Sequence, residues 1–353
     1  MSTLCQGVRV WHQKVVRLHS TSNLAGGPVT FRYTISTPTS NSAKKIDPKL
    51  PTVLFFHPVF VPQEVFTFQF GNPKLRQFNL VAVDMRSHGE SKGKIPKDFG
   101  QEMAAEDMSA FMKKMKLPPC HIFALSLGTI IAIQLAISHP DQILSLFLIS
   151  PLGLEEPQDA AEGRQAIHDA WVEGWRGGVP NQEELAYSVR GAIELAFFDP
   201  TNSMVQALCS LIIPSCMKNW NASHLDDYRI TTLDIFLNRR PHPIEELRKI
   251  KVPVKLVHGL ADVAYPLEYS KDFLNHLRDA DVNVSLEAID GASHFGCVEH
   301  HAIVNPMFHD FIIQQTEGRV KTTTKKIVSP WESTLKKNGW INAENILDDS
   351  DDE

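Results

Sequence analysis

The sequence of 353 residues predicts an α/β fold in which a mostly parallel, doubly wound sheet carries an inserted, all-helical cap. Two observations lead to this prediction. Short apolar runs alternate with helical patterns up to Ile149 and again from Val254, which is the order of a parallel sheet with helices on both faces. The long stretch between them shows helical patterns only. The sequence therefore predicts a core at residues 1–151 and 244–316, a cap at residues 152–243 and a C-terminal extension at residues 317–353.

The expected strands differ in how their two faces are covered. Apolar and polar residues alternate in the first two, as in strands with one face in water, whereas the later ones are mostly apolar runs, as in strands covered on both faces. The alternating strands are expected at residues 7–19 and 30–36, and the buried ones at residues 52–56, 79–83, 121–125, 145–149, 254–257 and 284–289.

The expected helices show apolar residues at helical spacing. In the core they are expected at residues 98–117, directly after Ser126, and at residues 267–277 and 298–315. In the cap they are expected at residues 159–175, 182–198, 203–218 and 226–238, with segments rich in Gly, Pro and Asn between them.

Ser126 lies at the corner between a buried strand and a helix. In the stretch Ala124-Leu-Ser-Leu-Gly128, small residues stand two positions before and two positions after the serine, as the tight turn of a nucleophile elbow requires. Such a turn lifts the hydroxyl above the sheet edge and directs the Leu127 amide, at a helix N-terminus, toward an oxyanion. The alternative is that Ser126 only caps the helix.

Two further polar residues follow later strands of the predicted sheet. Asp262 follows the strand at 254–257, and His294 follows the strand at 284–289. Because the carboxyl ends of parallel strands meet at one edge, these side chains are expected close to Ser126. A serine needs a base to remove its proton, and the base needs an acid to orient it. The alternatives are a loop histidine and an aspartate that caps the next helix.

These features together resemble the α/β-hydrolase superfamily, in its serine-nucleophile branch with a helical cap, over roughly residues 28–316. The resemblance implies that Ser126 is the nucleophile, His294 the base and Asp262 the acid. After the first buried strand, His57-Pro58 departs from the usual His-Gly of the family. Since Pro58 has no N–H, the second oxyanion donor beside Leu127 is expected to be the Val59 amide, with the Phe60 amide as the alternative.

The predicted function is that of a serine hydrolase that cleaves an apolar carboxylic ester, thioester or lactone through an acyl-enzyme. A carbon–carbon bond hydrolase of the same fold and a non-catalytic ligand-binding protein are the alternatives. The substrate, a small apolar acyl compound, is expected to contact His57, Phe60, Trp171 and Trp175. No cofactor and no metal are expected.

Composition limits the classes of partner. A net charge of −6 makes nucleic acid an unexpected partner, and the five scattered cysteines suggest neither a disulfide framework nor a zinc site. No signal segment or apolar run long enough for a transmembrane helix is evident, so a cytoplasmic location is expected. The acidic end of the extension is expected to be partly disordered. The oligomeric state is left open.

Overall fold

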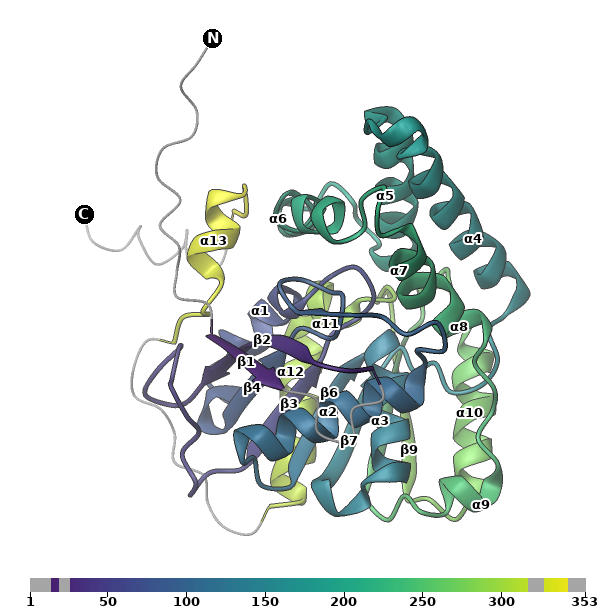
Figure 1. Cartoon of the computed structure of the whole chain (residues 1–353). Coiled ribbons are helices and arrows are strands. Elements are labelled where there is room, and N and C mark those ends of the chain that lie inside the picture. Colours follow the sequence, from purple (N-terminus) through teal and green to yellow (C-terminus); the bar gives the residue numbers. More distant parts are fainter. Residues whose placement is uncertain (1–13, 19–25, 317–326, 342–353) are drawn as a thin grey trace, which may run out of the picture.

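The computed structural model describes residues 14–18, 26–316 and 327–341, and its centre is a sheet of nine strands (Figure 1). Their order across the sheet is β1-β2-β4-β3-β6-β7-β8-β9, and β5 pairs with β2 at one side. The strands are β1 (Lys14–Leu18), β2 (Val29–Ser36), β3 (Thr52–Phe56), β4 (Asn79–Val83), β5 (Lys92–Gly93), β6 (Cys120–Leu125), β7 (Ile143–Ile149), β8 (Val254–Gly259) and β9 (Val284–Ile289).

The sheet is mostly parallel, as the sequence predicts. All neighbours from β4 through β3, β6, β7 and β8 to β9 run parallel, whereas β1 pairs with β2 and β2 pairs with β4 in the antiparallel sense. The described part of the first expected strand is β1, and its other residues lie outside the described ranges. Because β3, β6, β7, β8 and β9 are parallel, the loops that follow them meet at one edge.

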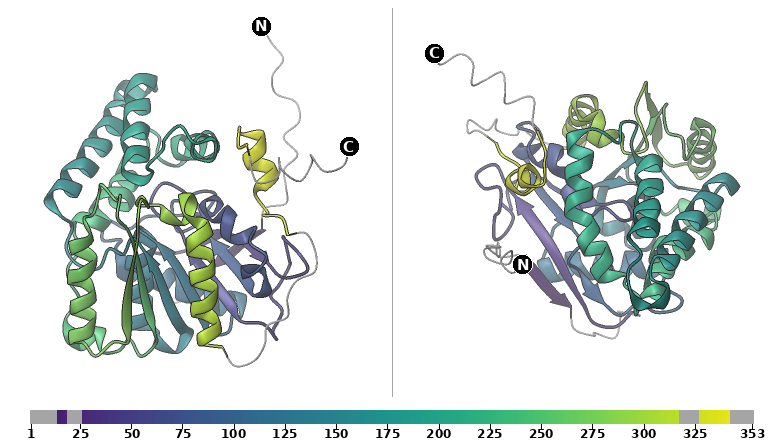
Figure 2. Two further views of the ribbon diagram at one scale, coloured as in Figure 1. Left: turned by 180° about the vertical axis from the view of Figure 1, so that it is seen from behind. Right: turned by 90° about the horizontal axis from the view of Figure 1, so that it is seen from above.

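Both faces of the sheet are covered by helices, which confirms the doubly wound prediction. In β3, Leu54 and Phe56 belong to the apolar core shared with α2, α3 and α10, whereas Val53 and Phe55 belong to the core shared with α1 and α12. Figure 2 shows the helices of these two layers on opposite sides of the sheet. The core helices are α1 (Thr67–Phe70), α2 (Gln101–Met115), α3 (Leu127–Ser138), α9 (Ile244–Leu247), α10 (Leu267–Asp279), α11 (Gly296–Glu299) and α12 (His301–Gln314).

Five helices between β7 and α9 lie above the carboxyl ends of the strands (Figure 1). They are α4 (Gln158–Glu173), α5 (Gln182–Ala196), α6 (Ser203–Asn219), α7 (Leu225–Arg229) and α8 (Ile235–Leu237). The helix expected at residues 226–238 is not uniform, because Ile230–Asp234 has π-helical hydrogen bonding. There the hydroxyls of Thr231 and Thr232 bond to the carbonyls of Asp227 and Tyr228, both at 2.7 Å, and side-chain bonds of this kind disturb the regular pattern.

The last described segment docks on both the core and the inserted helices. It contains α13 (Glu332–Lys337), flanked by the buried side chains of Trp331 and Trp340. The ring of Trp331 lies 4.6 Å from that of Phe70, and the backbone of Ile341 bonds to Ser203 at the start of α6. The acidic end, expected to be partly disordered, lies outside the described residues. No helix within the described ranges is long and apolar enough to cross a membrane.

Candidate active site

Ser126 occupies a strained corner between β6 and α3. Its backbone has φ +51° and ψ −116°, a conformation that L-residues rarely adopt and that is found at functional turns. The Ser126 amide donates to the Ile149 carbonyl at 3.0 Å. A Cβ atom on Gly128 would lie 2.4 Å from the Phe56 carbonyl oxygen, so only glycine allows α3 to approach β3 this closely. The predicted turn is therefore present, with the small residue required after the serine.

The structure brings Ser126, His294 and Asp262 together. His294 lies in the loop after β9, and its Nε2 is 2.9 Å from Ser126 Oγ. Its other ring nitrogen, Nδ1, is 2.6 Å from Oδ2 of Asp262, which lies in the loop after β8. All three side chains are buried. With Nδ1–H donating to the carboxylate, Nε2 is left to accept a proton from the serine hydroxyl.

The carboxylate of Asp262 is held in its ionised form. Burial alone would raise its pKa, but His294 and the Tyr265 amide outweigh burial and the pKa of Asp262 is lowered. Oδ1 accepts hydrogen bonds from the amides of Ala264 at 2.9 Å and Tyr265 at 3.0 Å. With Oδ1 occupied in this way, Oδ2 faces the imidazole.

The loop that carries His294 is fixed by contacts that the sequence does not reveal. Ser150 Oγ donates to the His294 carbonyl at 2.6 Å, and the Phe295 amide donates to the Ala196 carbonyl at 2.8 Å. A Cβ atom on Gly259 would lie 2.2 Å from the Ala292 carbonyl oxygen, so β8 and this loop touch backbone to backbone. In the sequence, only Ser150 after β7 and Gly259 at the end of β8 indicate that these contacts exist.

Backbone amides beside Ser126 are free to donate. Leu127 is the first residue of α3, so its amide has no acceptor within the helix. Across the described ranges, no acceptor is recorded for the amides of Val59 or Phe60 either, and Phe60 has a φ of +67° in the tight turn after β3. Both predicted oxyanion donors, Leu127 and Val59, are therefore available, and their role stays a prediction.

His57 takes a different place from the one predicted. Its Nδ1 lies 2.6 Å from the Pro58 carbonyl oxygen and its Nε2 accepts from the Met85 amide at 2.8 Å, so both ring nitrogens are occupied by backbone. Burial lowers the pKa of His57 to about 4, which keeps the ring neutral. His57 does not line the cavity over Ser126. The structure therefore gives it a position that supports the loop rather than one that contacts substrate.

A cavity of about 90 Å³ lies over Ser126 and His294, under the inserted helices. Phe60 and Trp171 line it, so their predicted contact with substrate stays a prediction, and most of the other lining residues are apolar. Trp175 is absent from the lining and packs against the cluster of Trp171, Leu185 and Trp220. Helical spacing predicts which side chains share a face of the helix but not how far each one reaches. The sequence therefore could not predict that Trp171 lines the cavity and Trp175 does not.

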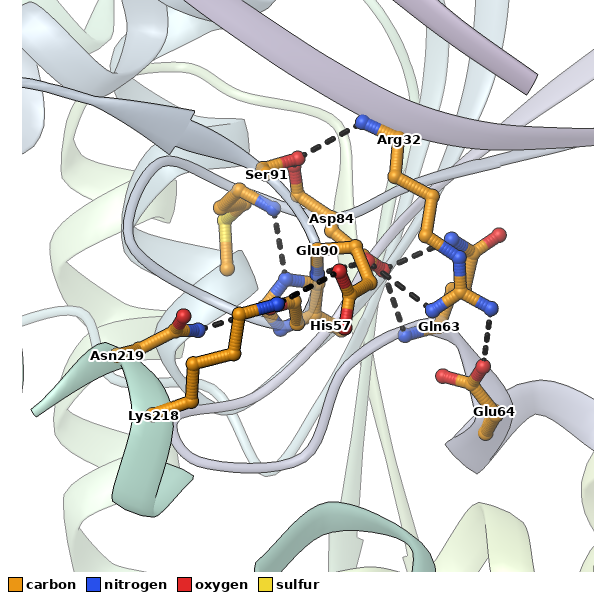
Figure 3. A network of polar contacts seen from close by, with 11 residues as sticks. Arg32, His57, Gln63, Glu64, Asp84, Glu90, Ser91, Lys218 and Asn219 are labelled. Atoms are coloured by element: carbon orange, nitrogen blue, oxygen red, sulfur yellow. Dashed lines mark hydrogen bonds and ion pairs between the residues drawn. The ribbon is translucent and has the colours of Figure 1, made fainter. Parts of the chain in front are cut away.

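The loop that carries Val59 is tied to the loop after β4 through Asp84 (Figure 3). The buried Asp84 carboxylate accepts from the amide and side chain of Gln63, at 3.2 and 2.9 Å, and from the Glu90 amide at 3.1 Å. Arg32 Nη1 lies 3.2 Å from the same carboxylate. This network fixes the position of the loop after β3, which carries the predicted oxyanion donor Val59.

The same network reaches the inserted helices at the end of α6. Figure 3 shows Lys218 directed at Glu90, with 3.4 Å between the charged atoms, and Asn219 donating to the Gly89 carbonyl at 2.8 Å. A Cβ atom on Gly89 would lie 2.2 Å from Asp84 Oδ2, so a side chain at this position would displace the carboxylate. No cluster of three or more metal-ligating side chains occurs within the part of the chain that the structure describes.

Comparison with known proteins gives one family match. A family model for the alpha/beta hydrolase fold matches residues 62–300. A pimeloyl-[acyl-carrier protein] methyl ester esterase of Neisseria meningitidis is 25% identical over 232 residues, which are 65% of this chain and 82% of that protein. An acetyltransferase component of the acetoin cleaving system of Cupriavidus necator is 26% identical over 148 residues, which are 42% of this chain and only 35% of that protein.

The fold is also found in solved structures. A thermophilic esterase from Thermogutta terrifontis matches with a TM-score of 0.65 and 16% identity, over 86% of this chain and 99% of the other. At this identity the likeness concerns the fold.

Proposed function

The chain belongs to the alpha/beta hydrolase fold family, and on this premise we propose that it is a serine hydrolase of carboxylic esters. The observation that carries the proposal is the hydrogen-bonded chain from Ser126 Oγ through His294 to Asp262, at 2.9 and 2.6 Å. Ser126 is the nucleophile, His294 the general base and acid, and Asp262 the residue that orients the imidazole and stabilises its charged form.

The reaction follows from this geometry. Ser126 Oγ attacks the ester carbonyl carbon while His294 Nε2 takes the hydroxyl proton. The oxyanion that forms accepts hydrogen bonds from the Leu127 and Val59 amides. His294 then gives its proton to the leaving alcohol as the C–O bond breaks, and an acyl ester remains on Ser126. A water molecule that His294 deprotonates attacks this ester, and the acid leaves as the serine regains its proton.

The cavity supports an acyl group of limited size. Most lining side chains are apolar, and the volume of about 90 Å³ is below the 150 Å³ of an engineered cavity that holds benzene. Apolar carboxylic esters, thioesters and lactones with short acyl groups fit such a site. The named activities of the Neisseria and Thermogutta relatives, which are both esterases, agree with the ester class.

Two of the sequence predictions complete the proposal. We infer that residues 152–243 form the cap: their helices lie above the strand ends (Figure 1), and some of their side chains, such as Trp171 and Leu208, line the cavity. The expected cytoplasmic location stays a prediction.

Labelling with a fluorophosphonate probe tests the proposal directly. The protein should be labelled at Ser126, and the Ser126→Ala variant should not be labelled. If the parent protein is not labelled but still binds apolar esters, a ligand-binding protein without catalysis is favoured instead. A carbon–carbon bond hydrolase would label as well, so turnover of p-nitrophenyl acetate and butanoate is measured alongside.

A further inference from the structure

Two arginines and one glutamate lie together where the inserted helices meet the core. Arg164 on α4 donates from Nε to Glu156 Oε1 at 2.6 Å, and Arg239 Nη2 lies 3.0 Å from Glu156 Oε2. The exposed fractions of the three side chains are 10% for Arg164, 3% for Arg239 and 3% for Glu156. Within the described ranges, Glu156 is the one carboxylate at ion-pair distance from either arginine. The cluster therefore contains two positive charges and one negative charge.

The excess positive charge has no compensation from the neighbouring hydroxyl. Tyr265 donates to Glu156 and accepts from Arg164 Nη2, both at 2.7 Å, and burial raises the pKa of Tyr265, so this side chain is neutral. Arg239 Nη1 is buried, with no hydrogen-bond partner in the described structure. A buried charge without a counter-charge is unfavourable by several kcal/mol, so an additional anion in this place would be stabilising.

Arg164 is the part of this cluster that lines the cavity over Ser126. It is the one Lys, Arg, Asp or Glu among the residues that line the cavity in the described structure. Its guanidinium lies 3.5 Å above the centre of the Phe236 ring, and its Nε and Nη2 are occupied by Glu156 and Tyr265. No partner is recorded for Nη1 within the described ranges. The ring of Tyr265 in turn stacks on the His294 imidazole, with 5.2 Å between the ring centres. Arg164 is thus the member of the cluster that lines the cavity, whereas Arg239 and Glu156 do not line it.

The position of Arg164 indicates that it contacts the acyl part of the substrate and not the alcohol part. A second hollow, of about 270 Å³, also reaches His294, and its rim includes the exposed side chains of Phe198 and Val263. His294 lines both hollows, whereas Ser126 lines only the first, so the acyl group on Ser126 is assigned to the first cavity and the alcohol that His294 protonates to the second hollow. Every residue that lines the cavity is buried or half-buried, and Arg164 lies there. The acyl chain, which stays on Ser126, therefore extends toward Arg164.

We infer that Arg164 binds a carboxylate at the far end of the acyl chain, so that the preferred substrates are half-esters of dicarboxylic acids. Guanidinium groups bind carboxylates through short, charge-assisted hydrogen bonds. This inference rests on the proposed ester hydrolysis and changes its substrate class in one respect: the chain next to the ester stays apolar, and its far end carries a carboxylate. The reaction is unchanged: the ester C–O bond is cleaved by water, and a dicarboxylate and an alcohol are released.

The test compares half-esters with neutral esters of equal chain length on the full chain. The pairs are monomethyl succinate and methyl butanoate, monomethyl glutarate and methyl pentanoate, and monomethyl adipate and methyl hexanoate. Each pair releases methanol, so the ratio of the two kcat/KM values reports the distal carboxylate alone. A hydrogen bond to a charged group leads us to expect a ratio of about tenfold to a hundredfold in favour of the half-ester for at least one chain length.

Three variants assign the effect to Arg164. Arg164→Gln should reduce the ratio to about one or below, and Arg164→Lys should reduce it at least about threefold, because the charge stays but the planar fork is lost. Arg240→Gln is the matched control, since Arg240 is exposed, lies beside Arg239 and, within the described ranges, donates to backbone carbonyls only. Its ratio should equal that of the parent. If Arg164→Gln does not fold, the parent and Arg164→Lys decide the question.

The possible failures are distinct. Ratios at or below one for all three pairs in the parent would overturn the inference and leave ester hydrolysis standing, because the neutral esters would still be cleaved. A high ratio that Arg164→Gln and Arg164→Lys leave unchanged would also overturn it, since the carboxylate would then be bound elsewhere. Absence of turnover of every ester, together with absence of fluorophosphonate labelling, would instead remove the proposed function.

Discussion

Gly128 lies so close to Phe56 that a Cβ atom on the glycine would be 2.4 Å from the phenylalanine carbonyl oxygen. The close approach sets the position of α3 and of the Leu127 amide at its start. Gly128→Ala is therefore expected to lower the free energy of unfolding by about 3 kcal/mol, as other severe backbone clashes do, and to reduce ester turnover. Urea unfolding and p-nitrophenyl butanoate hydrolysis measure the two effects.

Gly163 provides the matched control for this change. It lies inside α4, and the nearest atom to an added Cβ is Leu195 Cδ1 at 4.0 Å. Gly163→Ala should raise the free energy of unfolding by about 0.5 to 1 kcal/mol, because alanine restricts the unfolded chain and favours the helix. Equal effects of the two substitutions would contradict the role assigned to the contact with Phe56.

Removing the hydroxyl of Ser126 should abolish acyl-enzyme formation. Ser126→Ala is expected to lower kcat by about 10⁶, as for nucleophiles of other serine hydrolases, with the same circular dichroism spectrum. Ser138→Ala is the control, because Ser138 is exposed at the end of α3. A variant at position 126 that hydrolyses esters as fast as the parent would mean that another group is the nucleophile.

Asp262→Asn should trap the wrong tautomer of His294. The amides of Ala264 and Tyr265 require an oxygen at the Oδ1 position, so the new NH₂ group would face His294 Nδ1. Nδ1 must then accept, and the ring proton moves to Nε2, where it faces Ser126 instead of accepting from it. We expect kcat to fall by roughly 10⁴. Asp290→Asn, at an exposed site after β9, should leave kcat unchanged.

The buried His57 should make stability depend on pH. Its pKa is lowered to about 4 by burial, whereas the unfolded chain protonates it near pH 6.5. Its contribution is therefore complete above about pH 6.5 and is lost as the pH falls toward 4, by about 2 kcal/mol between pH 7 and pH 5. Between pH 7 and pH 5, the free energy of unfolding of His57→Gln should therefore fall by about 2 kcal/mol less than that of the parent.

Urea unfolding at pH 7, 6 and 5 measures this difference. His224→Gln, at an exposed site, should keep the pH dependence of the parent. Identical pH dependence in His57→Gln and the parent would show that the imidazole is not held neutral in the folded protein.

The positions of Ser126, Asp262 and His294 could be predicted because each follows a strand of a parallel sheet. The direction of the strands places these loops at one edge, and this follows from the alternation of strands and helices alone. The surroundings of the three residues depend on contacts between distant parts of the chain. Ser150, for example, bonds to the His294 carbonyl, 144 residues away in the sequence, and no local pattern marks that bond.

The residues that the sequence placed wrongly or missed share one property, which is that their role depends on the direction of a side chain. His57 follows a strand, but its ring turns toward the Met85 amide instead of the cavity. Arg164 is 8 residues from Glu156, but Arg239 lies much further along the chain, and an arginine inside a helix usually reaches solvent. Only the folded chain brings the two guanidinium groups to one carboxylate.

The two ends of α6 have a consequence for how stability is distributed among the inserted helices. Ser203 at its start bonds to the backbone of Ile341, and Asn219 and Trp220 at its end bond to Gly89 and Ser87. The turn between α4 and α5, in contrast, projects away from the sheet (Figure 1), and its Val179 is exposed. Amide hydrogens of α6 should therefore exchange with deuterium slowly and those of this turn rapidly.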